Sequence, residues 1–173
     1  EKGNIWMMIS FPIFGISLIL LYLASTLYHS AKDPSKRFKL KIFDHAAIYV
    51  LIAGSYTPFT LVSLNGETGW FIFSIVWILA FTGIILKLFF TGRLKVLSTA
   101  MYVLMGWLII FYFKELTANL HSDGVFYLII GGVFYTIGAV LYSIKKIKFN
   151  HAIFHVFVLG GSFCHFLSVY LYI

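Results

Sequence analysis

The sequence has little of what stabilises a water-soluble domain. Only 11% of its 173 residues are charged, and it contains a single cysteine, Cys164, which has no partner for a disulfide within the chain. A disulfide framework and a thiolate metal cluster are therefore excluded. The chain also lacks the ten-residue segments of alternating polarity that are typical of an outer-membrane barrel.

Apolar residues make up most of the chain, with 61% of the residues hydrophobic. Runs of about 20 apolar residues, long enough to cross about 30 Å of hydrocarbon as a helix, recur along the sequence. The sequence thus predicts an all-α integral membrane helical bundle that forms a single domain over residues 1–173. We expect six transmembrane helices, at about 5–30, 43–64, 69–90, 94–113, 124–144 and 150–172.

The positive charge of the chain is concentrated in the connections between these spans. A net charge of +7 is compatible with nucleic-acid binding, but its placement in short loops predicts membrane topology instead, so we expect no nucleic-acid partner. Because cytoplasmic loops collect Lys and Arg, the connections after the first, third and fifth spans should be cytoplasmic and both chain ends exterior. These connections carry eleven of the thirteen cationic residues: Lys32, Lys36, Arg37, Lys39, Lys41, Lys87, Arg93, Lys95, Lys145, Lys146 and Lys148.

An exterior N-terminus requires a segment that directs its translocation across the membrane. The sequence begins EKGN, without a signal peptide. We therefore expect a further transmembrane helix ahead of residue 1, which would give the intact protein seven.

Glycine and proline predict two features of the helix packing. The pairs Gly131-Gly132 and Gly160-Gly161 favour close helix contacts, because small residues let backbones approach. Pro58 lacks the backbone N–H that would bond Gly54, which predicts a kink in the second span.

Few ionisable side chains lie inside the spans, and each needs a partner because a lone charge in hydrocarbon is costly. Ser25 and His29 are four residues apart at the end of the first span, Asp44 lies in the first turn of the second, and His151 and His155 are four apart at the start of the sixth. The predicted topology places all five near the cytoplasmic face.

Three imidazoles around an open fourth position are the arrangement of a catalytic zinc site. We predict that His29, His151 and His155 bind Zn²⁺, that Asp44 is linked to the metal through water and acts as general base, and that Ser25 orients water or substrate. A purely structural alternative stays open. The histidines could be hydrogen-bonded packing residues or headgroup contacts, and Asp44 could be a helix cap.

The other histidines are expected to be packing residues or to be in contact with solvent. His165 lies ten residues beyond His155, roughly 15 Å along a helix, and cannot share its ion. His45 points about 100° away from Asp44, which favours an interfacial position, and His121 lies in an exterior loop.

Five segments of the chain resemble a known family: STLYH (25–29), FDHAAIYVLIAGSYTPF (43–59), MGW (105–107), GGVFYTIGAVLY (131–142) and HAIFHVFVLGGSFCHF (151–166). They are similar to bacterial hemolysin III, the bacterial branch of the progestin and adiponectin receptor family. The resemblance implies a seven-helix protein of the bacterial plasma membrane, with zinc held by His29, His151 and His155 and linked to Asp44 through water. The wider group resembles alkaline ceramidases, which hydrolyse a lipid amide. His45 departs from the animal receptors, which have an aromatic residue there.

These observations leave several functions open. The first is a zinc-dependent hydrolase whose partners are membrane lipids or a fatty-acyl substrate cleaved at an amide or ester. The second is a sensor or regulator of membrane-lipid composition with a structural zinc. Cytolysis through a pore is disfavoured, because the spans carry one polar layer and no continuous polar stripe. A metal-free pH switch built on the same histidines is the last alternative.

Overall fold

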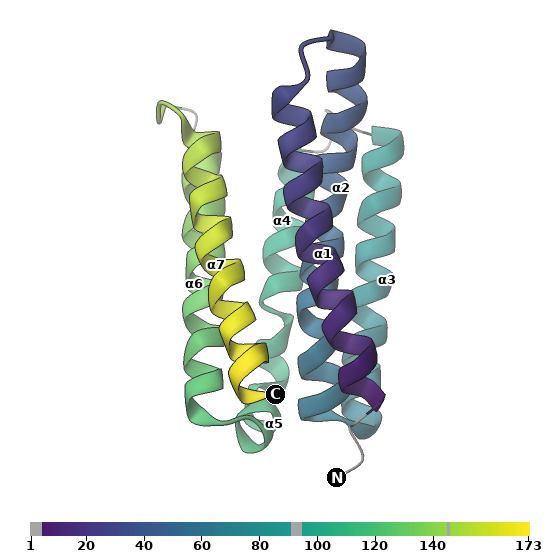
Figure 1. Ribbon diagram of the computed structural model, residues 1–173, viewed down its shortest axis with the longest axis vertical. Helices are drawn as coiled ribbons and strands as arrows, with labels where there is room; N and C mark the ends of the chain where they lie inside the picture. Colours follow the sequence, from purple (N-terminus) through teal and green to yellow (C-terminus); the bar gives the residue numbers. More distant parts are fainter. Residues whose placement is uncertain (1–4, 91–94, 145) are drawn as a thin grey trace. The chain divides into compact units, whose positions relative to one another are not determined.

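The computed structural model describes residues 5–90, 95–144 and 146–173, without the side chains of Lys95, Val96 and His151. Within these ranges every regular element is helical (Figure 1). Six helical stretches are long and apolar enough to cross a membrane: Ile5–Ser30, Pro34–Leu64, Gly66–Phe90, Leu97–Asn119, Ser122–Ser143 and Ala152–Tyr172. The predicted all-α membrane protein with six spans is thereby confirmed, and the expected helix ahead of residue 1 stays a prediction.

The helices fall into two compact groups, one ending at Met105 and the other beginning at Gly106. The expected single domain over residues 1–173 stays a prediction. The first group contains these elements: α1 (Ile5–Ser30), α2 (Pro34–Pro58), the π-helical η1 (Phe59–Leu64), α3 (Gly66–Phe90) and α4 (Lys95–Gly106). Within it α2 packs against both α1 and α3. Gly54 of α2 lies so close to Ser17 of α1 that a side chain there would collide with the serine.

The second helix begins at Pro34, well before the predicted start at residue 43. Asp33 caps it, because the Asp33 carboxylate accepts a hydrogen bond from the backbone N–H of Lys36 at 2.8 Å. Pro34 occupies the first turn, where its missing N–H costs nothing. The prediction was wrong because it followed the apolar run, whereas the helix also includes the basic turns before that run.

The sequence prediction also missed the shape of the fourth span. Residues 94–113 were expected to form one helix, but α4 ends at Gly106 and is followed by the 3₁₀-helical η2 (Leu108–Tyr112) and by α5 (Phe113–Asn119). The break falls after glycine, the residue that most weakens a helix interior, and Trp107 leaves helical geometry at φ −97° and ψ 3°. By contrast, the change from α2 to η1 falls at Pro58, where the sequence predicted an irregularity.

The position of Lys87 differs from the predicted charge distribution. It was counted with the connection after the third span, but it lies within α3 and is 7% exposed. Its Nζ atom lies 6.0 Å from the centre of the Tyr102 ring, so the ammonium group faces an aromatic surface. Of the other cations used for topology, Arg93 and Lys145 and the side chain of Lys95 lie outside the described residues.

The second group of helices contains η2, α5, α6 (Ser122–Ser143) and α7 (Asn150–Tyr172), and α6 and α7 lie side by side along their length (Figure 1). Gly124, Gly131 and Gly138 recur every seven residues on α6, and a side chain at any of them would collide with α7. Gly161 of α7 also lies in this contact, because the Tyr135 ring is 2.8 Å from where its Cβ would be. Gly132, the neighbour of Gly131, has nothing within 4 Å of the position that its own Cβ would occupy.

This seam makes a matched pair of variants possible. We expect Gly131→Leu to lower the free energy of unfolding by about 1–3 kcal/mol, since the new side chain collides with the His165 ring and the Gly161 backbone. Gly132→Leu should have little effect because the space beside Gly132 is open. Thermal unfolding in one detergent measures both, and equal losses would contradict the assignment of Gly131 to the helix contact.

Candidate functional site

Asp44 lies at the centre of the candidate site in the first group of helices. Its side chain is 3% exposed, although it is a carboxylate inside a membrane-spanning helix. The Ser25 hydroxyl donates a hydrogen bond to this carboxylate, and His29 lies close enough to interact with it electrostatically. Ser25 and His29 lie one turn apart on the same face of α1, so a single helix presents both to Asp44.

The local sequence explains why these three residues meet. The connection between α1 and α2 is short, so the last turns of α1 run antiparallel to the early turns of α2, and the two helices pack together. Because α2 begins at Pro34, Asp44 lies well inside the helix and not in its first turn. The structural alternative in which Asp44 is a helix cap is therefore wrong, since Asp33 has that role.

One carboxylate oxygen of Asp44 distinguishes this site from a closed hydrogen-bond network. The Oδ1 atom is buried and has no hydrogen-bond partner among the described atoms. Leaving such an atom unsatisfied costs about 1–3 kcal/mol, and more for a charged group. A carboxylate with a free oxygen beside an imidazole fits the donor set that accompanies a zinc ion, where the carboxylate binds the water or histidine next to the metal.

The two remaining predicted ligands lie on α7, in the second group of helices. His155 is half-buried, with its ring centre 5.5 Å from that of Phe154. His151 is part of the same helix, but its side chain lies outside the described part of the structure. Among the side chains that are described, no three of His, Cys, Asp and Glu form a group that could hold a metal ion. Because His151 is not among them, the zinc site of His29, His151 and His155 stays a prediction.

The start of α7 is fixed to the end of α6. The Asn150 amide donates hydrogen bonds to the carbonyl oxygens of Tyr142 at 3.0 Å and Ile144 at 3.4 Å. Phe149, the residue before it, adopts a left-handed backbone with φ 59° and turns the chain into the helix. These hydrogen bonds of Asn150 hold the first turn of α7, which includes residue His151, next to the end of α6.

The other histidines make contacts outside the Asp44 site. His165 is 9% exposed and its Nε2 atom donates to the Leu128 carbonyl oxygen at 3.3 Å, in agreement with the expected packing role. His45 is half-buried, with Nδ1 2.7 Å from the Lys41 carbonyl oxygen, and its expected position at the membrane interface stays a prediction. His121 precedes α6 and accepts a hydrogen bond from the Asp123 backbone N–H at 3.3 Å.

A buried polar cluster between α2, α3 and α4 was missed by the sequence reasoning. The Tyr49 and Tyr102 rings are 4.5 Å apart, and the Lys87 ammonium lies over the Tyr102 ring. The Tyr102 hydroxyl donates to the His45 carbonyl oxygen at 2.9 Å, which ties α4 to α2. A lysine inside an otherwise apolar run was the signal that could have revealed it.

Comparison with known proteins adds a further observation. The family described as "Haemolysin-III related" matches residues 2–166. The chain is 50% identical to the Hemolysin-3 homolog of Bacillus subtilis over 170 residues, which cover 98% of this chain and 80% of the relative. It is 47% identical to Hemolysin-3 of Bacillus cereus over 173 residues, covering 100% and 79%. It is also 29% identical over 185 residues to the human Monocyte to macrophage differentiation factor, covering 99% and 74%.

Proposed function

The chain belongs to the haemolysin-III-related family, and on this premise we propose that it is a zinc-dependent membrane hydrolase that cleaves a lipid amide or ester near the cytoplasmic face. The human relative supports the placement in the wider progestin and adiponectin receptor family. The observation that carries the proposal is the environment of Asp44, a buried carboxylate that is oriented by Ser25, adjacent to His29 and open at Oδ1.

The proposed metal ligands are the imidazoles of His29, His151 and His155, with Asp44 linked through water. When bound, Zn²⁺ would supply a Lewis acid that polarises a carbonyl group and acidifies water near neutral pH. The donor set is suited to this metal, since three neutral imidazoles leave one coordination position open. A metal held there would also give the Oδ1 atom of Asp44 a hydrogen-bond partner through water.

Asp44 would act as the general base and then as the general acid. Its carboxylate takes a proton from water as the water oxygen forms a bond to the carbonyl carbon of the substrate. The bond from that carbon to nitrogen or oxygen then breaks, and the proton passes from Asp44 to the amine or alcohol that leaves. The hydrogen bond from Ser25 fixes the orientation of the carboxylate, so that Oδ1 stays directed at the reacting water.

The membrane setting favours a lipid as the substrate. Asp44, Ser25 and His29 lie on two helices that are each long and apolar enough to span the bilayer. A substrate with acyl chains would reach this layer from the lipid phase, and burial would exclude bulk water from the carboxylate. Basic residues in the neighbouring connection favour the cytoplasmic side for this end of the bundle.

Metal analysis of the purified full-length protein tests the zinc assignment. We expect one zinc per chain in the unaltered protein and a loss of zinc in His155→Ala, because removal of one of three ligands disrupts the site. His121→Ala is the matched control, since His121 is exposed and lies in the connection before α6. Elemental analysis by mass spectrometry measures all three proteins. An unaltered protein without zinc, or a His155→Ala variant that keeps it, would contradict the proposal.

The reaction itself is tested by incubating the purified protein with a total lipid extract and measuring released fatty acids and amines by mass spectrometry. A hydrolase should release product from an amide or ester class of lipid, and the same extract with His155→Ala should not. A zinc-loaded protein that cleaves neither class would favour a lipid sensor with structural zinc.

A further inference from the structure

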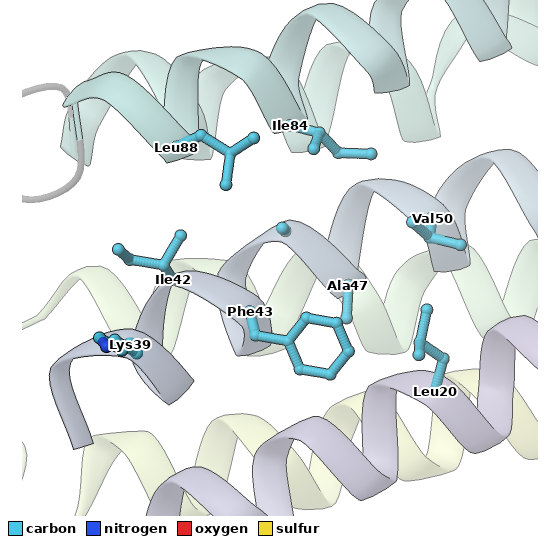
Figure 2. A pocket seen from close by; sticks show the side chains of 9 residues that line it. Leu20, Lys39, Ile42, Phe43, Ala47, Val50, Ile84 and Leu88 are labelled. Carbon is cyan, nitrogen blue, oxygen red and sulfur yellow. The ribbon is translucent and has the colours of Figure 1, made fainter. Parts of the chain in front are cut away.

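A groove separate from the Asp44 site lies over α2, between α1 and α3 (Figure 2). It has a volume of about 460 Å³, which is within the range of small-molecule sites. Its floor is formed by six residues of α2 from Lys39 to Val50. Leu20 reaches toward it from α1, and Ile84 and Leu88 do so from α3 (Figure 2). Ser25, His29 and Asp44 are not among its lining residues.

The groove has one charged end and is otherwise apolar. Lys39 is the one charged residue among the lining side chains that the structure describes. Figure 2 shows it at the end nearest the start of α2, with Val50 and Leu20 at the other end. The side chains of Ala46 and Ala47 are smaller than those around them, which leaves room for an acyl chain to lie along the helix. A ligand with a negative head and a long apolar tail fits this distribution.

The length of the groove corresponds to half of a bilayer. Lys39 and Val50 are eleven residues apart, which is about 16 Å along an α-helix. The hydrocarbon core of a bilayer is about 30 Å thick, so one leaflet provides about 15 Å. An acyl chain lying in the groove would therefore extend from the headgroup level near Lys39 to about the middle of the membrane.

The charge near the groove favours an anionic headgroup. The first turns of α2 also carry Lys36, Arg37 and Lys41. Asp33, the acidic residue beside them, uses its carboxylate to cap the helix. Basic pockets between transmembrane helices commonly bind the headgroups of anionic lipids.

We propose that this groove binds one acyl chain of an anionic phospholipid, with the Lys39 ammonium contacting the lipid phosphate. The site is independent of the proposed hydrolysis, because its lining includes no residue of the Asp44 site. A bound lipid would fill the space over α2 between α1 and α3.

Native mass spectrometry of the full-length protein tests this proposal. The protein is equilibrated with equal amounts of dioleoyl phosphatidylglycerol and dioleoyl phosphatidylcholine, which carry the same acyl chains but differ in net charge. We expect retention of phosphatidylglycerol over phosphatidylcholine in the unaltered protein. Lys39→Gln should lower that preference about fivefold, the factor expected for one cation at an anionic surface.

Two further sets of variants make the result decisive. Val50→Phe should reduce retention of both lipids because it fills the groove, and Leu20→Phe does the same from α1 if Val50→Phe does not fold. Lys146→Gln removes an exposed cation near the start of α7 and is the matched control. Equal effects of Lys39→Gln and Lys146→Gln would overturn the proposal in favour of general charge attraction. A change in oligomer mass in Val50→Phe, without loss of lipid, would overturn it in favour of a second copy of the chain.

Discussion

Replacing Asp44 with asparagine should lower the hydrolytic rate by about 10²–10⁴-fold while the protein stays folded. Asparagine has nearly the same shape as aspartate and its amide oxygen still accepts the hydrogen bond from Ser25. It does not accept a proton near neutral pH, so only the base function is removed. The measurement is the turnover rate on the lipid class identified with the unaltered protein, together with thermal unfolding of both proteins.

Asp33→Asn is the matched control for this variant. It makes the same chemical change on the same helix, but Asp33 is exposed and serves as the cap of α2. Asparagine caps a helix about as well as aspartate, so both rate and stability should be close to those of the unaltered protein. If Asp44→Asn keeps full turnover, Asp44 is not the base, and the role proposed for it in the hydrolysis is wrong.

Asp33 and Asp44 lie in different environments, and only the burial of Asp44 needs a functional explanation. A carboxylate at a helix start is stabilised by free backbone N–H groups and by the helix dipole, as Asp33 is. Asp44 is within the helix, where the backbone N–H groups are already bonded, and it is 3% exposed. The hydrogen bond from Ser25 and the nearby His29 accompany this carboxylate, but its Oδ1 atom has no hydrogen-bond partner among the described atoms.

The sequence was sufficient to predict that Ser25, His29 and Asp44 belong to one layer. Helical spacing places Ser25 and His29 on one face of α1, and the short connection makes α2 its antiparallel neighbour. Both arguments depend on local geometry. The sharing of that layer with His151 and His155 depends on how distant helices are arranged, and it stays a prediction.

Other features could not be predicted from periodicity. The start of α2 at Pro34 depends on the cap provided by Asp33, which a search for apolar runs does not detect. The burial of Lys87 depends on Tyr102, which comes from another helix. The groove beside Lys39 depends on the sizes of side chains from three helices. In each case the deciding contact joins residues whose proximity the apolar pattern does not specify.

Removal of zinc should destabilise the unaltered protein and, to a smaller extent, Asp44→Asn, but not His155→Ala. A ligand that binds only the folded state, present at 100 times its dissociation constant, stabilises that state by about 2.7 kcal/mol. For a chain of this size the corresponding fall in the unfolding midpoint on chelation is several degrees. His155→Ala should already unfold at the lower temperature and show no further fall, because it lacks a proposed ligand.

Asp44→Asn separates the role of a metal ligand from that of a base. A carboxylate that binds the metal only through water contributes about 10–100-fold to metal affinity, so zinc in excess should restore the midpoint of this variant. Turnover should stay low in the same sample, since the base is still absent. Differential scanning fluorimetry with a chelator, followed by added Zn²⁺ or Mg²⁺, makes the comparison. Restoration by Mg²⁺, or an unaltered protein whose midpoint does not respond to chelation, would contradict a zinc site of three imidazoles.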